Sequence, residues 1–245
     1  MSLTDKIEIP RRTMVLFFIV DTSGSMDGSK IGAVNMAIRE VLPEIRSMSA
    51  ENADALIKIA ALEFSSGATW ITKNGPVEAD NFNWSNIDAA GVTDFGAACK
   101  ALNEKLSTKA FMLEATGSFA PALFLLSDGA PTDDWQKGLD ILKGNNWFKA
   151  AVKVAIAIGD DADQDVLAAF TGTKETVLTA HTPAILAKMI KFVSVTASKV
   201  ASTNSKADPT QGDPDNAKTE ELINNLNELK DDVSSAPDNS NTDMW

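Results

Sequence analysis

The chain of 245 residues has one cysteine, one histidine and no tyrosine. A single cysteine, Cys99, excludes an internal disulfide and any metal site built from several cysteines. We interpret Cys99 as a small buried hydrophobe, because it lies inside an expected helix with no histidine near it in the sequence. The single histidine, His181, follows a short expected strand, where a capping or turn role explains it. Nothing in the sequence supports a catalytic triad.

Long hydrophobic segments and clusters of basic residues are also missing. The longest apolar run has seven residues, 14–20, far fewer than the roughly 20 that span a bilayer. This run lacks the small-residue cleavage site of a signal peptide, so we expect no export signal and a cytoplasmic location. The net charge of −12 argues against nucleic acid or an anionic membrane as a partner, because phosphate binding needs clustered Lys and Arg.

The negative charge is concentrated at the end of the chain. Residues 201–245 contain ten acidic and three basic residues. Their composition, rich in Ser, Asn, Asp and Pro, is typical of a linker or disordered tail. An apolar stripe at helical spacing within the tail is compatible with a short helix near residues 217–233, either self-packed or docked on a partner: Leu222, Leu226, Leu229 and Val233. We therefore divide the chain into a lead-in (1–12), a folded domain (13–200) and an acidic, largely disordered tail (201–245).

Within the folded domain, strand-length apolar segments alternate with amphipathic segments of helical length. The expected strands are 14–20, 55–64, 67–72, 121–126, 150–158 and 176–178, and the expected helices are 29–48, 93–106, 132–143, 165–170 and 183–199. This alternation predicts an α/β fold with a doubly wound, mostly parallel sheet and helices on both faces. A Ser-Ser-Gly turn after residue 64 predicts a hairpin and one antiparallel edge strand. We expect residues 74–90 to form an irregular surface connector, and Pro43 to bend or weaken the last turn of its helix.

The stretch from Val15 to Met26 reads V-L-F-F-I-V-D-T-S-G-S-M, an apolar strand that runs into a polar loop. Asp21, Ser23 and Ser25 alternate at the carboxyl end of this strand, where open α/β sheets bind ligands. Gly24 lets the loop curl so that the three side chains can converge. One carboxylate and two hydroxyls suit Mg²⁺ and poorly suit zinc or copper. Alternatively, the serines cap the helix that follows.

Two further oxygen donors follow in positions where a doubly wound sheet would gather them with the first loop. Thr93 lies at the start of an expected helix, and Asp128 follows the apolar run 121–126. With these partners the metal interpretation is favoured over helix capping.

The motifs D-T-S-G-S, G-V-T-D and L-L-S-D-G resemble the von Willebrand factor A (vWA) domain and its metal-ion-dependent adhesion site (MIDAS). The MIDAS pattern is D-x-S-x-S with a distant Thr and a distant Asp, and all five positions are filled here by the expected residue type. The resemblance implies a vWA domain over residues 13–200. It also implies that Mg²⁺ or Mn²⁺ is bound by Asp21, Ser23, Ser25, Thr93 and Asp128.

Three segments resemble the bacterial TerY-like proteins of tellurium-resistance and related stress gene clusters. They are D-T-S-G-S-M, A-V-N at residues 33–35 and D-G-A-P-T-D-D-W-Q-K-G-L at residues 128–139, and the resemblance covers roughly residues 11–198. That group lacks an evident catalytic centre and is associated with kinases and PP2C-type phosphatases, which makes those two classes the candidate partners. Some of its members carry a zinc ribbon, which a chain with one cysteine cannot form.

The resemblance implies a metal-ion-dependent protein–protein interaction module that is not an enzyme. Three hydroxyl ligands and two carboxylates, direct or through water, would leave the ion electrophilic. An acidic side chain from a partner protein could then complete its coordination shell. We therefore expect a protein partner that supplies a carboxylate.

The main alternative is a Mg²⁺-dependent phosphotransferase or phosphatase of the haloacid-dehalogenase-like type, which also begins with an apolar strand ending in Asp. Such enzymes need a second carboxylate two residues later, where this chain has Ser23. They also need a lysine near the metal. Lys30 is the only near candidate, and it is expected in the following helix.

Two other groups of acids have simpler interpretations. The run from Asp160 to Asp165 hints at a calcium loop, but it has Val166 and Gly172 where an EF-hand needs Gly and Glu, so helix capping is favoured. Asp94, Asp133 and Asp134 could rim the metal face, although acids are ordinary in the first turn of a helix.

Overall fold

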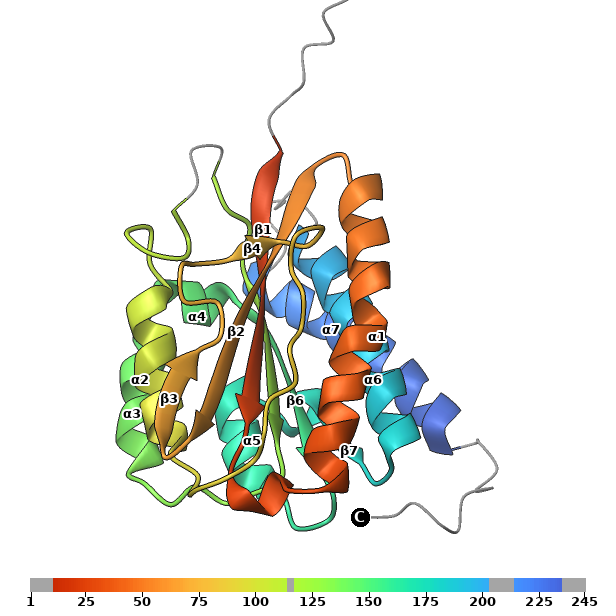
Figure 1. The fold of residues 1–245 in the computed structure, drawn as a ribbon. Coiled ribbons are helices and arrows are strands. Elements are labelled where there is room, and N and C mark those ends of the chain that lie inside the picture. Colours follow the sequence, from red (N-terminus) through yellow and green to blue (C-terminus); the bar gives the residue numbers. More distant parts are fainter. Residues whose placement is uncertain (1–10, 114–116, 203–213, 235–245) are drawn as a thin grey trace, which may run out of the picture.

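A computed structural model describes residues 11–113, 117–202 and 214–234, which contain a seven-stranded sheet (Figure 1). The strands follow the order β3-β2-β1-β5-β6-β7, with β4 also paired to β2. Their bounds are β1 (Arg12–Asp21), β2 (Ala55–Ser65), β3 (Gly67–Trp70), β4 (Val77–Glu78), β5 (Ala122–Ser127), β6 (Val152–Ile158) and β7 (Val177–Ala180). All pairs from β2 through β1, β5 and β6 to β7 are parallel, whereas β3 and β4 are antiparallel to β2. The predicted doubly wound α/β fold is confirmed, and the short strand β4 is an addition to it.

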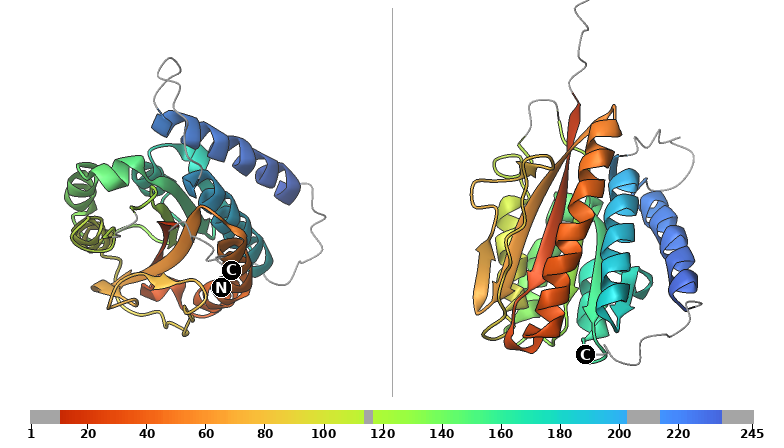
Figure 2. Two further views of the ribbon diagram at one scale, coloured as in Figure 1. Left: turned by 90° about the horizontal axis from the view of Figure 1, so that it is seen from above. Right: turned by 45° about the vertical axis from the view of Figure 1, so that its right-hand side comes forward.

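Helices cover both faces of the sheet (Figure 2). The helices are α1 (Ser29–Glu51), α2 (Phe95–Lys105), α3 (Trp135–Lys143), α4 (Asn146–Ala150), α5 (Gln164–Thr171), α6 (Pro183–Ser202) and α7 (Pro214–Ser234), with short 3₁₀ helices η1 (Gly24–Met26) and η2 (Lys174–Thr176). One layer contains α1 and α6, with α7 outside α6, and the other contains α2, α3 and α5. Sequence analysis missed α4 and began α3 three residues too early.

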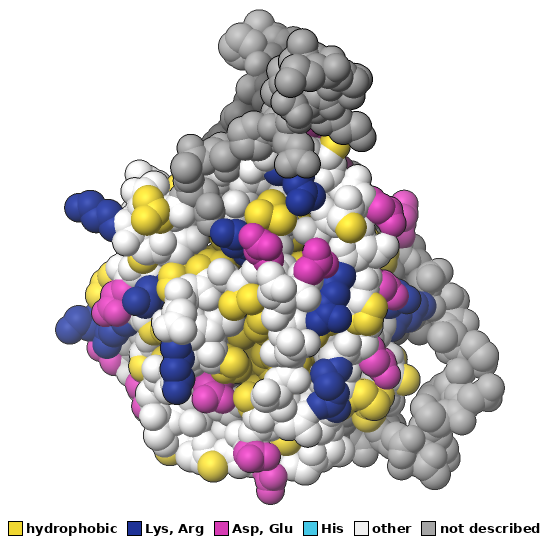
Figure 3. All heavy atoms as spheres, turned by 45° about the horizontal axis from the view of Figure 1, so that its top comes forward, with side chains coloured by type: hydrophobic (Ala, Val, Ile, Leu, Met, Phe, Trp, Pro, Cys, Tyr) yellow, Lys and Arg dark blue, Asp and Glu magenta, His cyan; other side chains and the backbone are white. Residues whose placement is uncertain are grey.

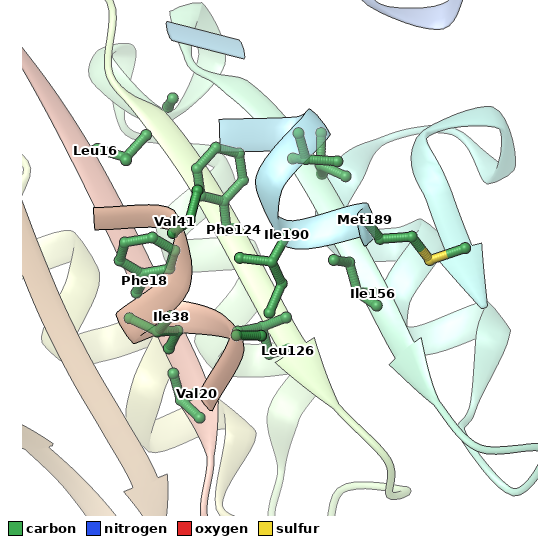
Figure 4. Packing of buried hydrophobic residues seen from close by; sticks show 14 of the residues in the cluster. Leu16, Phe18, Val20, Ile38, Val41, Phe124, Leu126, Ile156, Met189 and Ile190 are labelled. Carbon is green, nitrogen blue, oxygen red and sulfur yellow. The ribbon is translucent and has the colours of Figure 1, made fainter. Parts of the chain in front are cut away.

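Alternation along β1 assigns its side chains to the two layers. Leu16, Phe18 and Val20 pack with α1 and α6, as Figure 4 shows. Phe17 and Ile19 point to the opposite face and pack with α2 and α5. All five are at most 1% exposed, because a central parallel strand is covered on both faces. The continuous apolar run is therefore explained by the position of β1 in the middle of the sheet.

Helix α1 continues through Pro43 and ends at Glu51. The proline was expected to weaken the last turn. Burial of Leu42 and Ile45 on either side of it holds the helical segment against the sheet, and packing of this kind outweighs a local propensity.

The connector between β3 and α2 is irregular as predicted, apart from a two-residue strand, but part of it is buried and not on the surface. It contains β4 and buries Phe82, Trp84 and Ile87 against the layer of α1. Asn35 of α1 fixes it from below: its side-chain oxygen accepts hydrogen bonds from Trp84 Nε1 (2.9 Å) and Ile87 N (3.0 Å), and its amide donates to Ile87 O (2.9 Å). The segment is a loop, as its composition predicts, and one buried amide and three large apolar side chains anchor it against α1.

Helix α7 lies within the stretch predicted as an acidic tail. Leu222, Leu226 and Leu229 are at most 2% exposed and join the core cluster that contains α6. Lys230 donates a hydrogen bond to the carbonyl of Glu175 (2.9 Å), so the helix also contacts η2. The parts of the tail at 203–213 and 235–245, and most of the lead-in, lie outside the described residues.

Charges of both signs are interspersed on the face that Figure 3 shows, with hydrophobic side chains between them. Among the helices of the described ranges, none is both long enough and apolar enough to cross a membrane.

Substitution of Asn35 by Ala should lower the free energy of unfolding by about 3 kcal/mol, because Trp84 Nε1 and both backbone groups of Ile87 would lose their buried partner. Urea denaturation measures the change. Asn74→Ala, at an exposed loop position, is the control and should have little effect. A loss under about 1 kcal/mol for Asn35→Ala would contradict the anchoring role.

Cys99 should resist thiol reagents in the native protein, because it is 1% exposed and burial raises the pKa of its thiol well above the ordinary value. Ellman's reagent should therefore react with the chain only after denaturant is added. Rapid reaction of the native protein would show that α2 opens away from the sheet.

Candidate metal centre

The parallel register of β1 and β5 brings two carboxylates to one edge of the sheet. Val20 is opposite Leu126, so the next residues, Asp21 and Ser127, are neighbours. Ser127 Oγ donates a 2.6 Å hydrogen bond to Asp21 Oδ2, and Asp128 follows directly. Two residues that are 107 positions apart in the chain thus meet because both strands end at the same level.

The loop after β1 turns its two serines toward Asp128. Asp21 Oδ1 accepts from the backbone N–H of Ser23 (2.8 Å), the hydroxyls of Ser23 and Ser25 are 3.1 Å apart, and Ser25 Oγ donates to Asp128 Oδ1 (2.8 Å). Ser23 is the N-cap residue of η1 but makes no side-chain capping bond, and the N-cap of α1 is Gly28. The structure therefore does not support the alternative that these serines cap a helix.

Thr93 comes to the same point from a third loop. Gly24 N donates to Gly91 O (3.0 Å), and the backbones of Thr22 and Ala90 are joined by a 2.8 Å hydrogen bond. These bonds fix the segment before Thr93 against the first loop. Gly91 has φ +88°, and a side chain there would collide with Ser66 in the turn between β2 and β3, so the backbone at this position requires glycine.

A single point near Gly129 measures how closely the three loops converge. A Cβ atom added to Gly129 would lie 3.5 Å from Ser25 Oγ, 3.5 Å from Thr93 Oγ1 and 3.9 Å from Asp21 Oδ2. Asp128 and Ser23 are linked to this point through their contacts with Ser25. All five predicted residues are thus brought together, and all but Ser25 are buried.

The electrostatics of the cluster favour a cation. Burial raises the pKa of Asp21 and outweighs the hydrogen bonds from Ser127 and Ser23, and the nearby charge of Asp128 raises it further. Within the described ranges, no three His, Cys, Asp or Glu side chains form a metal-binding group. Any ion held here would therefore have hydroxyl oxygens among its main ligands, a donor set that fits a hard divalent cation.

Lys30 is a member of the site whose position sequence analysis did not predict. Its Nζ lies 2.5 Å from Asp128 Oδ2, and its side chain is only 14% exposed. The sequence predicts only that this lysine lies in the helix that follows the first loop. A lysine in the first turn of a helix interacts unfavourably with the helix dipole. This is the feature of the sequence that could have indicated a contact of Lys30 outside its own helix.

Ser127 and Thr132 were also missed. Ser127 holds Asp21, while the hydroxyl of Thr132 accepts from Thr93 N (3.1 Å) and the backbone N–H of Thr132 donates to Thr93 O (2.8 Å). Both residues position a predicted ligand. Their roles depend on contacts between distant segments, and no local pattern in the sequence encodes them.

Two of the three neighbouring acids, Asp133 and Asp94, have structural partners, whereas Asp134 is the N-cap residue of α3 without a side-chain capping bond. Asp133 accepts from Gly96 N and Ala97 N at the start of α2 (3.0 and 3.1 Å), and Asp94 accepts from Gly67 N (2.8 Å). Asp163 caps α5, as the preferred interpretation of the acidic run expected. His181 Nδ1 lies 2.9 Å from Asp160 on the surface.

No protein-family model and no curated protein sequence matches the chain. Solved structures do match its fold. A von Willebrand factor type A protein from Catenulispora acidiphila aligns with TM-score 0.56 and 18% identity over 76% of this chain and 43% of its own. Mussel byssus proximal thread matrix protein 1, solved with a zinc-occupied MIDAS motif, aligns with TM-score 0.54 and 16% identity over 75% of this chain and 48% of its own.

The vWF domain of the pilus tip protein Mfa5 from Porphyromonas gingivalis aligns with TM-score 0.55 and 10% identity over 82% of this chain and 99% of its own. This chain spans less than half the length of the first two proteins, whereas it covers the Mfa5 domain almost completely. Identities this low show a common fold and no more. The chain therefore has the fold of a vWA domain.

Proposed function

We propose that this protein is a metal-ion-dependent protein–protein interaction module of the MIDAS type. The observation that carries the proposal is the convergence of Asp21 Oδ2, Ser25 Oγ and Thr93 Oγ1, from two separate loops, within 4 Å of one point beside Gly129 on a third loop. Asp128, which precedes Gly129, accepts a 2.8 Å hydrogen bond from Ser25 Oγ. Burial raises the pKa of Asp21 and so disfavours its charge, and the buried Asp128 lies in the same cluster. A bound cation would offset the cost of the Asp21 charge.

The proposed ligands are Asp21, Ser23, Ser25, Thr93 and Asp128, and the proposed ion is Mg²⁺ or Mn²⁺. Both ions prefer oxygen donors. The mussel protein with a zinc-occupied MIDAS supports a divalent ion at this kind of site, although a donor set without nitrogen or sulfur suits zinc less well. When bound, the ion would supply an electrophilic centre whose remaining positions are open to an oxygen ligand.

The outer side of the oxygen cluster is accessible to solvent, as a ligand from another molecule would require. Ser25, Gly24 and the neighbouring Val92 are exposed, while Asp21 and Ser23 are buried beneath them. An acidic side chain could thus reach the ion from solvent without rearrangement of the sheet. The proposed partner is a protein that supplies this carboxylate.

The finer setting rests on the TerY-like motifs of the sequence. We assign the protein to a cytoplasmic tellurium-resistance or stress-signalling complex, with a kinase or a PP2C-type phosphatase as the partner. In this setting the chain is a non-enzymatic adaptor.

Lys30 is the one observation that favours the phosphotransferase alternative, because a lysine beside the metal could neutralise a phosphoryl group. Ser23 still stands where such an enzyme needs its second carboxylate. Hydrolysis of p-nitrophenyl phosphate with Mg²⁺ distinguishes the two functions. We expect no turnover, whereas turnover that disappears with Asp21→Asn would establish the enzyme.

Substitution of Asp21 by Asn should reduce Mn²⁺ or Mg²⁺ affinity at least about tenfold, because one of two ligand charges is removed while the side-chain shape is kept. Isothermal titration of the chelator-stripped protein measures the affinity. Asp140→Asn, at an exposed position of α3, is the matched control and should bind like the parent.

The same pair of variants tests whether the effect is local. Since burial raises the pKa of Asp21, its ionised form opposes folding at neutral pH in the absence of metal. Asp21→Asn should therefore melt no lower than the parent in EDTA. Equal metal affinity for Asp21→Asn and Asp140→Asn would refute the proposed site.

A further inference from the structure

We propose that Lys30 sets the balance between metal and partner at this site. Its ammonium group weakens the binding of the divalent ion to the free protein and strengthens the binding of an external carboxylate to the metal-loaded protein. This inference rests on the proposed function and assigns a specificity role to a residue outside the ligand set.

The contact itself is short and mostly shielded from solvent. Lys30 Nζ lies 2.5 Å from Asp128 Oδ2, with side-chain exposures of 14% for the lysine and 0% for the aspartate. The other oxygen of the same carboxylate, Oδ1, accepts from Ser25. Asp128 thus has one oxygen directed to the oxygen cluster and one to the ammonium group, so both can act on it at the same time.

The energetics of helix α1 do not explain why position 30 is a lysine. Lys30 is the second residue of α1, whose first turn contains no acid and whose N-cap, Gly28, provides no side-chain bond. A cation in that turn opposes the helix dipole. The compensation comes from Asp128, 98 residues away in the chain, which ties the lysine to the site.

Charge counting gives the consequence. Asp21, Asp128 and Lys30 together carry one net negative charge, and the addition of a divalent ion makes the cluster positive by one. Without the lysine the same cluster would change from two negative charges to neutral. The lysine therefore lowers the attraction for the metal and leaves a positive charge that an acidic side chain can neutralise.

A purely structural role for Lys30 makes a different prediction. If the lysine only braced Asp128, its removal would loosen a ligand and weaken the binding of both metal and carboxylate. The charge role predicts opposite changes in the two affinities. Whether removal of the lysine raises or lowers the affinity for the metal therefore separates the two roles.

The first experiment titrates MnCl₂ into the chelator-stripped full-length chain by calorimetry. Lys30→Met should bind Mn²⁺ roughly tenfold more tightly than the parent, while Lys30→Arg, which keeps the charge, should stay close to it. Lys149→Met is the matched control, because it removes the same charge from an exposed position on α4. This helix precedes β6 and so lies at the opposite edge of the sheet. Circular dichroism confirms that each variant is folded.

The second experiment uses acetate as the carboxylate probe on Mn²⁺-loaded protein. Displacement of metal-bound water by acetate lowers the water-proton relaxation rate, and the acetate concentration at half effect gives the affinity. Lys30→Met should bind acetate roughly tenfold more weakly than the parent or Lys149→Met.

The outcomes keep the two proposals apart. If the parent binds no Mn²⁺, the proposed function fails. If the parent binds Mn²⁺ and acetate but Lys30→Met binds both more weakly, or both equally well, the role of Lys30 is overturned and the MIDAS-type site stands. Tighter metal with weaker acetate supports the inference.

Discussion

The parallel pairing of β1 with β5 is the constraint on which the site depends. Both strands are buried on their two faces, so their ends are fixed by the core and cannot adjust independently. Because the register sets Val20 opposite Leu126, Asp21 lies beside the Ser127–Asp128 pair at the edge of the sheet. The segment before Thr93 is held beside this edge by two backbone hydrogen bonds, from Ala90 N to Thr22 O and from Gly24 N to Gly91 O. Side-chain convergence is thus a consequence of how the central strands pair.

The burial of carboxylates at this edge has an electrostatic consequence. Asp21 and Asp128 are nearly inaccessible to water and repel each other. Hydroxyl donors, the backbone N–H of Ser23 and one ammonium group compensate their charges. Hydrogen bonds from Ser25 and Ser127 stabilise the charges in part. A site with many hydroxyls and few acids can admit a divalent cation without neutralising its whole charge, which is the property that the proposed interaction module needs.

Much of this arrangement could be predicted from the sequence, because it is encoded locally. The run of seven apolar residues before Asp21 identified a central strand, and the D-T-S-G-S pattern identified the loop. The strand and helix order then indicated which edge the other donors would reach. The predicted parallel sheet and its antiparallel neighbour were confirmed for the same reason.

The misses share a physical cause, since each depends on contacts between distant segments. The connector after β3 is irregular as predicted, yet Asn35 and the buried Trp84 hold part of it inside the molecule and not on the surface. Lys30 was judged by its place in a helix, whereas its partner lies 98 residues away. Ser127 has no assigned role in the L-L-S-D-G motif, yet its hydroxyl donates to Asp21. A sequence pattern reports periodicity and local chemistry, but it does not report which side chains meet across strands.

The most direct measurement is anomalous X-ray diffraction from crystals of the full chain grown with Mn²⁺. The three-loop convergence predicts one strong anomalous peak beside Gly129, within direct or single-water distance of Ser23, Ser25 and Thr93, with Asp21 and Asp128 around it. An ion found elsewhere, or a crystal saturated with Mn²⁺ that shows no peak at this edge of the sheet, would contradict a metal centre formed by these five residues.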